Sequence, residues 1–321
     1  MSEATYDEFS MFRDNCSDVG LPWPGEPVVE RVALEVEPGR SVSALRWGTE
    51  PAEIVFVHGG AQNAHTWDTV LLAMGRPALA VDLAGHGRSD WRPKQDYAPQ
   101  LMAADVLAQM QAFAPAPQVV VGMSLGGLTA LCATAKVATA ADPDPALTIP
   151  QLVLLDVSPG VDHAKAEPII TFVDGPQYFD SFADILARTM EHNKTRTESS
   201  LRRGILHNAK ELEDGRWTWR YDPMRDWKRP DDSSAEDAGS APAPSGPSGP
   251  NFADLWTMVD NVEVPITLLQ GGAWSVVDDA DIAEFRRRKP DLVVEKIADA
   301  GHSIQGDQPL ALAERLGQLL G

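Results

Sequence analysis

Short apolar runs that end in glycine or a polar turn recur along the chain, and they constrain its fold more than any other feature. Each is long enough for one strand, and stretches of helical character lie between them. Strands that are apolar throughout, without polar alternation, are typical of parallel sheets buried on both faces. The sequence therefore predicts an α/β fold with a mostly parallel sheet flanked by helices. The runs are residues 53–60, 78–87, 118–124, 151–160, 265–272 and 292–302, and the helical stretches are 67–74, 99–114, 125–141, 279–288 and 310–320.

The alternation of apolar runs with helical stretches is interrupted in two places. Residues 28–36 and 41–47 alternate apolar and polar positions around the turn EPGR, which predicts an antiparallel hairpin. Residues 161–260 separate two strand-like runs and contain an amphipathic stretch. Within them, residues 231–250 have no apolar side chain larger than alanine or proline, so we expect a flexible loop there. We predict a core of residues 1–160 and 261–321, with a helical insertion of residues 161–260 between the sixth and seventh strands.

Composition narrows the classes of partner and compartment. A net charge of −20 disfavours binding to nucleic acid or anionic membranes, because both require a basic surface. The two cysteines, Cys16 and Cys132, cannot form a disulfide framework, and we expect free thiols. The first residues lack the basic and apolar regions of a secretory signal, and no apolar run reaches bilayer-spanning length. These features predict a cytoplasmic protein that acts on a small molecule, either as a monomer or as a homo-oligomer.

One motif indicates nucleophilic chemistry. The stretch Gly122-Met123-Ser124-Leu125-Gly126 fits G-x-S-x-G, the nucleophile elbow between a strand and a helix. In this turn the serine takes a strained backbone conformation that projects its hydroxyl above the sheet, and bulky side chains two residues away would clash. An apolar β-branched run precedes the motif and a helical stretch follows it. We therefore predict that Ser124 is a nucleophile.

A nucleophilic serine needs a base and an orienting acid, which follow it in the order Asp/Glu, then His in this kind of fold. Of the seven histidines, His302 alone lies in a loop after the last strand-like run, directly after a glycine. The other histidines fall in glycine motifs, helices, loops before the nucleophile or the insertion. We predict His302 as the base.

The acid has more than one candidate. The loop after residues 265–272 is the usual place, but it carries Ser275 where the carboxylate is expected, and Asp278 and Asp279 resemble the first turn of the next helix. Asp156 instead ends a buried strand next to the nucleophile strand, where an idle charge would be costly. We predict Asp156 as the acid, with Asp278 or Asp279 as the alternative.

An oxyanion hole requires two backbone N–H groups directed at the developing negative charge. The residue after the nucleophile, Leu125, should supply one. The other should come from the glycine loop after the first buried strand, and we predict Gly60, with Ala61 as the alternative.

Together these motifs resemble the α/β-hydrolase fold superfamily. The resemblance is carried by VHGG followed by Trp67, VDLAGHGRSD at residues 81–90, GMSLGG, and AGHS at residues 300–303. It covers the chain from about Glu53 to the C-terminus, apart from the insertion, and it implies that the insertion is a cap over the active site. It also implies a structural role for the loop at residues 82–90. Ser275 departs from the commonest family pattern, whereas lipases and zearalenone-type lactonases carry the acid after the strand that Asp156 ends.

The sequence thus predicts a serine hydrolase that cleaves a carboxylic ester or lactone through an acyl-enzyme, with no cofactor. No metal site is expected, because ligand spacings such as H-E-x-x-H are absent. Five of the nine tryptophans lie in or beside the insertion, so an apolar or aromatic substrate pocket is predicted, the alternative being a small core for the insertion itself. The residues predicted to line this pocket are Trp217, Trp219, Trp256 and Trp274.

Other functions remain open on the same residues. A Ser-His-Asp triad also supports C–C bond hydrolysis or perhydrolase activity, and no residue pattern separates these from ester cleavage. Epoxide hydrolases and dehalogenases use an aspartate where this chain has Ser124, which disfavours them. A ligand-binding protein on a hydrolase scaffold is the non-enzymatic alternative.

Overall fold

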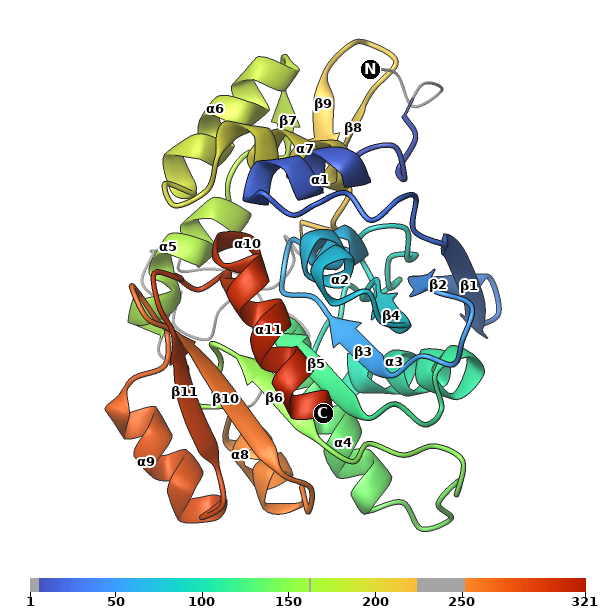
Figure 1. Ribbon diagram of the computed structural model, residues 1–321, viewed down its shortest axis with the longest axis vertical. Helices are drawn as coiled ribbons and strands as arrows, with labels where there is room; N and C mark the ends of the chain where they lie inside the picture. The colour runs from blue at the N-terminus through green and yellow to red at the C-terminus, as the bar shows by residue number, and fades with distance from the viewer. Residues whose placement is uncertain (1–5, 162, 224–251) are drawn as a thin grey trace, which may run out of the picture.

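The computed structural model describes residues 6–161, 163–223 and 252–321, and an eight-stranded sheet runs through its centre (Figure 1). The strand order is β1-β2-β4-β3-β5-β6-β10-β11. β2 runs antiparallel to both of its neighbours, and all the other pairs are parallel. The strands are β1 (Val29–Glu37), β2 (Arg40–Trp47), β3 (Ile54–Val57), β4 (Ala78–Val81), β5 (Val119–Met123), β6 (Leu152–Leu155), β10 (Ile266–Gly271) and β11 (Val293–Ile297). The predicted fold class is confirmed, with the hairpin at one edge of the sheet.

Helices cover both faces of this sheet. One apolar cluster joins it to α3 (Pro99–Phe113), α4 (Leu125–Ala138), α8 (Phe252–Asp260) and α9 (Asp279–Arg288). The cluster on the opposite face joins it to α1 (Phe12–Val19), the 3-10 helix η2 (Ala64–Trp67), α2 (Asp68–Met74) and α11 (Pro309–Leu320). The short helix α10 (Ile304–Asp307) precedes α11. α1, whose Phe12 and Cys16 are buried in the second cluster, is not among the helices that the sequence predicted.

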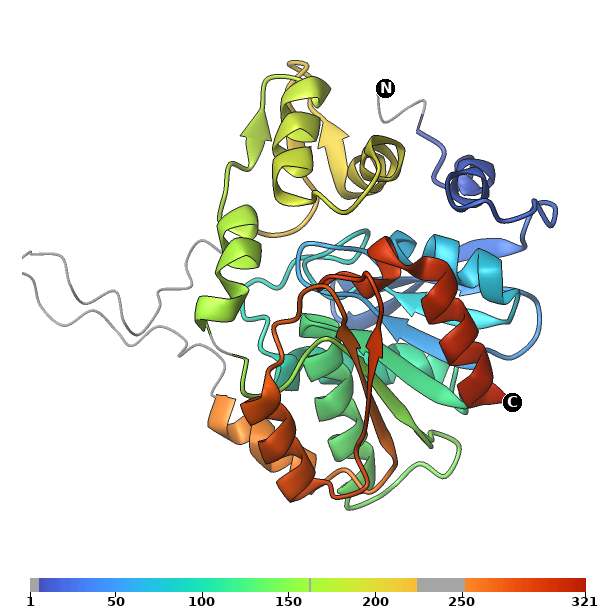
Figure 2. The same cartoon turned by 60° about the vertical axis from the view of Figure 1, so that its left-hand side comes forward.

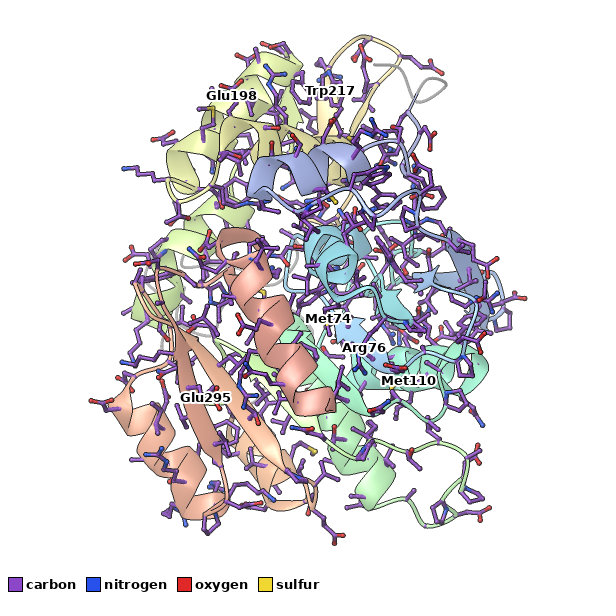
Figure 3. All side chains as sticks on the ribbon, viewed as in Figure 1. Met74, Arg76, Met110, Glu198, Trp217 and Glu295 are labelled. Atoms are coloured by element: carbon purple, nitrogen blue, oxygen red, sulfur yellow. The ribbon has the colours of Figure 1, made fainter. Side chains whose placement is uncertain are left out.

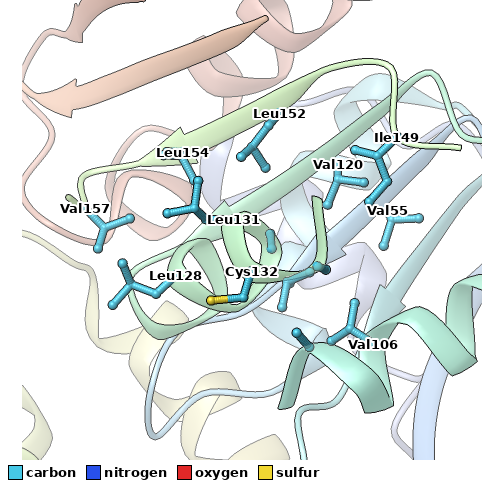
Figure 4. Packing of buried hydrophobic residues seen from close by; sticks show 14 of the residues in the cluster. Val55, Val106, Val120, Leu128, Leu131, Cys132, Ile149, Leu152, Leu154 and Val157 are labelled. Carbon is cyan, nitrogen blue, oxygen red and sulfur yellow. The ribbon is translucent and has the colours of Figure 1, made fainter. Parts of the chain in front are cut away.

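The central strands are apolar throughout because each serves both clusters. In β6, Leu152 and Leu154 pack in the first cluster, whereas Val153 and Leu155 pack in the second. Successive side chains of a strand point to opposite faces, so a strand covered on both sides needs apolar residues at every position. Figure 4 shows the first cluster, in which β6 and α4 pack together.

The residues between β6 and β10 form both helices and a second sheet. The small antiparallel sheet has the order β7-β9-β8, with β7 (Tyr178–Phe179), β8 (Ala209–Glu211) and β9 (Trp217–Trp219). Around it lie α5 (His163–Val173), α6 (Phe182–His192) and α7 (Glu198–Asn208). The sequence predicted a helical insertion, and this prediction is wrong in part, because the insertion also contains the sheet β7-β9-β8. Figure 2 shows this region and α1 on the same side of the main sheet.

The insertion has a core of its own. Phe179, Ile185, Leu201 and Trp217 belong to a third apolar cluster, which also includes Ala61 from the main-sheet region. Trp217 lies within the insertion near the top of the molecule in Figure 3. The domain boundaries remain a prediction, and α8, inside the predicted insertion, packs on the main sheet through Leu255. The flexible loop predicted at residues 231–250 lies outside the described residues. Among the described residues, no helix has both the length and the apolar character needed to span a membrane.

Candidate active site

Ser124 occupies the strained turn that the motif predicts. It lies between β5 and α4 with φ 51° and ψ −123°, a conformation that a residue with a side chain rarely adopts. Strain of this kind costs about 1–3 kcal/mol and persists where the surroundings fix it, often at functional sites. Ser124 is partly exposed, whereas β5 below it is buried.

The two glycines of the motif are required for different reasons. A Cβ on Gly122 would lie 2.6 Å from the carbonyl oxygen of Gly126, inside the turn itself. A Cβ on Gly126 would lie 2.2 Å from the carbonyl oxygen of His58, at the end of the neighbouring strand β3. We had expected both clashes to arise within the turn. The second glycine instead allows α4 to start close against β3.

His302 and Asp156 meet at the same edge of the sheet. His302 Nδ1 lies 2.9 Å from Asp156 Oδ2, although 146 residues separate them. Asp156 directly follows β6, is fully buried and has φ 47°, so it too is held in a strained conformation. A carboxylate at Nδ1 fixes the imidazole tautomer that leaves Nε2 free to accept a proton. Nε2 of His302 is buried and has no hydrogen-bond partner among the described residues.

Backbone and hydroxyl groups satisfy the rest of the Asp156 carboxylate. The Gly271 N–H donates to Oδ1 at 3.1 Å, and the Val276 N–H donates to Oδ2 at 3.1 Å. The Ser275 hydroxyl also donates to Oδ1. Position 275, where the family usually has its acid, thus contacts the carboxylate that comes from β6.

The two alternative acids have a different role in the structure. Asp278 is the N-cap of α9, where it forms a capping box with Asp281 and an ion pair with Lys165. This ion pair, together with the backbone N–H of Asp281, lowers the pKa of Asp278 to about 2. Asp279 is the first residue of α9 and is exposed. Neither has a hydrogen bond to His302 among the described residues.

The loop after β3 approaches the nucleophile closely. A Cβ on Gly59 would lie 2.4 Å from Met123 Sδ and 3.3 Å from Ser124 Cβ, so this position requires glycine. A Cβ on Gly60 would meet only Leu125 Cδ2, at 3.8 Å. Ala61 has φ 56°, the third strained residue at this edge of the sheet.

Two N–H groups at this point are available for a ligand. The Gly60 N–H has no hydrogen-bond acceptor within the described chain. Leu125 is the first residue of α4, where backbone N–H groups have no acceptor inside the helix. The geometry is compatible with an oxyanion hole formed by the predicted residues.

A family model described as the alpha/beta hydrolase family matches residues 54–315. The chain belongs to this family. It is a hydrolase by membership, and the match includes all the strained residues at the edge of the main sheet.

The relatives give the comparison more detail. The esterase Rv0045c of Mycobacterium tuberculosis is 40% identical over 318 residues, covering 96% of this chain and 94% of the relative. A crystal structure of that esterase superposes with a TM-score of 0.80 at 39% identity, over 98% of both chains. E-2-(acetamidomethylene)succinate hydrolase superposes with a TM-score of 0.69 over 91% of this chain and 99% of the other, but at 18% identity it shows the fold alone.

The predicted pocket tryptophans lie in different surroundings. Trp217 and Trp219 are each 5% exposed and pack in the insertion's own core, which was the alternative interpretation. Trp256 packs on Phe285, on the main-sheet side. Trp274 alone combines exposure, at 42%, with proximity to the site, because its ring lies edge-on to His302 at 6.1 Å.

One cluster of potential metal ligands lies outside this site. Donor atoms of His65, Asp68 and His207, all buried, lie within 4.8 Å of one another. However, the two imidazole rings are stacked, with centroids 3.8 Å apart and planes at 13°. Nitrogen lone pairs lie in the ring plane, so those of stacked rings run side by side and do not converge on one ion. Burial opposes a charge on His65, but Asp68 and Glu8 outweigh it and raise the pKa of His65 to about 9. The arrangement fits an imidazolium between carboxylates.

Sequence reasoning missed several contacts of the site. Asn208 of α7 donates to the Ala61 carbonyl, and Asp307 of α10 accepts from the Gly301 N–H beside His302. Gln305 of α10 donates to Gln62 of the loop after β3, at 3.2 Å. The residues in the first and last of these contacts lie more than 140 positions apart, and no motif marks them.

Proposed function

We propose that the protein is a serine esterase, with Ser124 as nucleophile, His302 as base and Asp156 as the orienting acid. The hydrogen bond between His302 and Asp156, at the edge of the sheet that also carries Ser124 in its strained turn, is the observation that carries the proposal. The likeness to a protein named an esterase over nearly the whole chain supports the ester as substrate class.

The proposed reaction follows from these positions. Asp156 accepts a hydrogen bond from the Nδ1–H of His302 and stabilises the imidazolium that forms. Nε2 of His302 therefore takes the proton of Ser124 as the serine oxygen attacks the carbonyl carbon. The N–H groups of Gly60 and Leu125 stabilise the oxyanion, and His302 then protonates the departing alkoxide. The resulting acyl-enzyme is cleaved by water, which His302 activates in the same way. A lactone would react identically, except that its alcohol stays attached to the acyl group.

The insertion is proposed to be a cap over this site. Its contacts support this. Asn208, the last residue of α7, donates to the Ala61 carbonyl, and Thr195, just before α7, donates to Asp307, which also accepts from the Gly301 N–H beside His302. The exposed Trp274 beside His302 supports a substrate with an apolar or aromatic acyl or alcohol group. The substrate of the protein would then be a small-molecule ester.

A fluorophosphonate probe tests the proposal directly. The intact protein should be labelled at Ser124 and should hydrolyse p-nitrophenyl esters. Ser124→Ala should lose the label and roughly 10⁵–10⁶ of kcat, the scale found when a nucleophilic serine is removed. Ser17→Ala, at an exposed serine of α1, is the control and should retain both. An unlabelled intact protein would favour the ligand-binding alternative, and labelling without ester turnover would direct attention to C–C bond or perhydrolase substrates.

A further inference from the structure

The C-terminal end of α7 contacts the loop that approaches Ser124. Asn208 Nδ2 donates to the Ala61 carbonyl at 2.6 Å, and Asn63 Nδ2 donates to Asn208 Oδ1 at 3.2 Å. All three residues are buried. The amide of Asn208 therefore fixes a peptide next to Ala61, whose left-handed backbone is strained and needs external support.

The residues just before α7 contact α10, which follows the loop that carries His302. Thr195 Oγ donates to Asp307 Oδ1 at 2.8 Å, and the Gly301 N–H donates to Asp307 Oδ2 at 2.8 Å. One carboxylate thus ties the insertion to the residue that precedes His302. Nearby, Arg196 packs on Gly306, where a Cβ would lie 3.2 Å from the guanidinium carbon, so the contact is close.

The element between these two contacts is well suited to keep them at a fixed spacing. α7 has 11 residues, which corresponds to a length of about 16 Å. Its N-cap Thr197 accepts from the Ser200 N–H, and its residues Leu201 and Ile205 pack in the same cluster as Ala61. A capped and packed helix holds its ends at a fixed separation more firmly than an irregular loop does.

We propose that Asn208 and Thr195 are positioning residues, through which α7 holds the oxyanion loop and the His302 loop in register with Ser124. The inference rests on the proposed function and adds to it a catalytic purpose for the insertion. Asn208 acts through Ala61, and Thr195 acts through Asp307; neither needs to touch the substrate.

This arrangement has a kinetic consequence. Displacement of the oxyanion loop weakens hydrogen bonds that form fully only in the transition state, so kcat falls whereas KM changes little. A misplacement of about 1 Å can cost about 100-fold in rate. A cap that only encloses substrate would show the opposite behaviour, with the loss in KM.

Asn208→Asp is the sharpest variant. It keeps the shape of the side chain and the bond from Asn63, but it replaces the donor to Ala61 by a second acceptor. We expect kcat for p-nitrophenyl esters to fall about 10- to 100-fold, with KM within about threefold of the wild-type value. Thr195→Val, which removes the donor to Asp307, should lower kcat by a smaller factor. Arg202→Gln is the matched control, because Arg202 is an exposed residue of α7 that pairs only with Glu198 among acidic residues in the described chain.

A transition-state analogue separates positioning from a loss of fold. Phenylboronic acid forms a tetrahedral adduct with a reactive serine, so its inhibition constant should rise in Asn208→Asp by about the factor lost in kcat/KM. The melting temperature of Asn208→Asp and its circular dichroism identify a variant that has not folded, and Asn208→Ser then provides a smaller side chain for the same comparison.

The outcomes are distinct. Kinetics of Asn208→Asp and Thr195→Val that equal those of Arg202→Gln, or a loss confined to KM, would overturn the inference and leave the proposed function intact. An intact protein that the fluorophosphonate does not label would overturn both. A fall in kcat that phenylboronic acid affinity follows supports the inference.

Discussion

The edge of the main sheet and the insertion differ in backbone strain. Ala61, Ser124 and Asp156, which follow β3, β5 and β6, all have positive φ values. Among the described residues of the insertion, only a glycine, Gly215, does so. Of the five described non-glycine residues with positive φ, these three thus lie at the proposed site, the other two, Gln95 and Asp299, lie elsewhere in the core, and the described insertion has none. The comparison indicates that the sheet holds the reacting groups, whereas the insertion supports them from outside.

The largest expected effect tests the acid at the sheet edge. Asp156→Asn keeps the shape of the side chain but removes the charge beside His302, so kcat should fall roughly 10⁴-fold with the fold retained. The measurement is steady-state hydrolysis of a p-nitrophenyl ester, with circular dichroism as a check on folding.

Asp278→Asn is the matched control for this variant. Asparagine is as good an N-cap as aspartate, so α9 should survive and kcat should stay near the wild-type value. Inactivity of Asp278→Asn combined with near-normal activity of Asp156→Asn would transfer the role of acid to the loop after β10.

A second prediction asks whether the acid can move between strands. Ser275 already donates to Asp156 Oδ1, so a carboxylate introduced at position 275 would lie close to the same imidazole. We expect the double variant Asp156→Asn/Ser275→Asp to regain about 10- to 100-fold of the kcat that Asp156→Asn loses. No recovery would mean that the imidazole requires the carboxylate in the position that β6 gives it.

The same contrast explains how much the sequence could predict. The six parallel strands and the positions of Ser124, Asp156 and His302 are marked by local patterns, such as an apolar run, a glycine motif or a loop position. Asn208 carries no such mark, and the loop position of Ser275 indicated only a missing carboxylate. Their contacts with Ala61 and Asp156 could not be predicted because these partners are distant in sequence. Trp217 and Trp219 of β9 were predicted to line a pocket, with a core for the insertion as the alternative, and no local pattern distinguishes the two environments.

A third prediction concerns the junction of the N-terminal segment, the core and the insertion. His65, whose pKa is raised to about 9, lies between Glu8 and Asp68, stacks on His207 of α7 and has Arg31 nearby. A raised pKa means that protonation stabilises the folded state; the contribution is complete below the ordinary value of about 6.5 and is lost as the pH rises through about 9.

Chemical denaturation across this range provides the measurement. The free energy of unfolding should decrease by about 1–3 kcal/mol between pH 6.5 and 9.5, and His65→Gln should show a flatter dependence. Because all three regions meet at His65, proteolysis of the insertion should also increase over the same range. A pH profile of His65→Gln that parallels the wild-type profile would contradict the assignment.

The smallest expected effect compares a tryptophan of the sheet edge with one of the insertion. Trp274 lies beside His302 and is exposed. Trp274→Ala should therefore raise KM about two- to tenfold for aromatic esters and less for short aliphatic ones. This factor corresponds to the loss of an aromatic contact of about 0.5–1.5 kcal/mol. Trp217→Ala should lower the melting temperature instead, because Trp217 is buried against Phe182, and the ratio of KM values for the two ester types should not change. An equal change of that ratio in both variants would mean that the insertion lines the pocket directly. It would contradict the view that the insertion only supports the sheet edge.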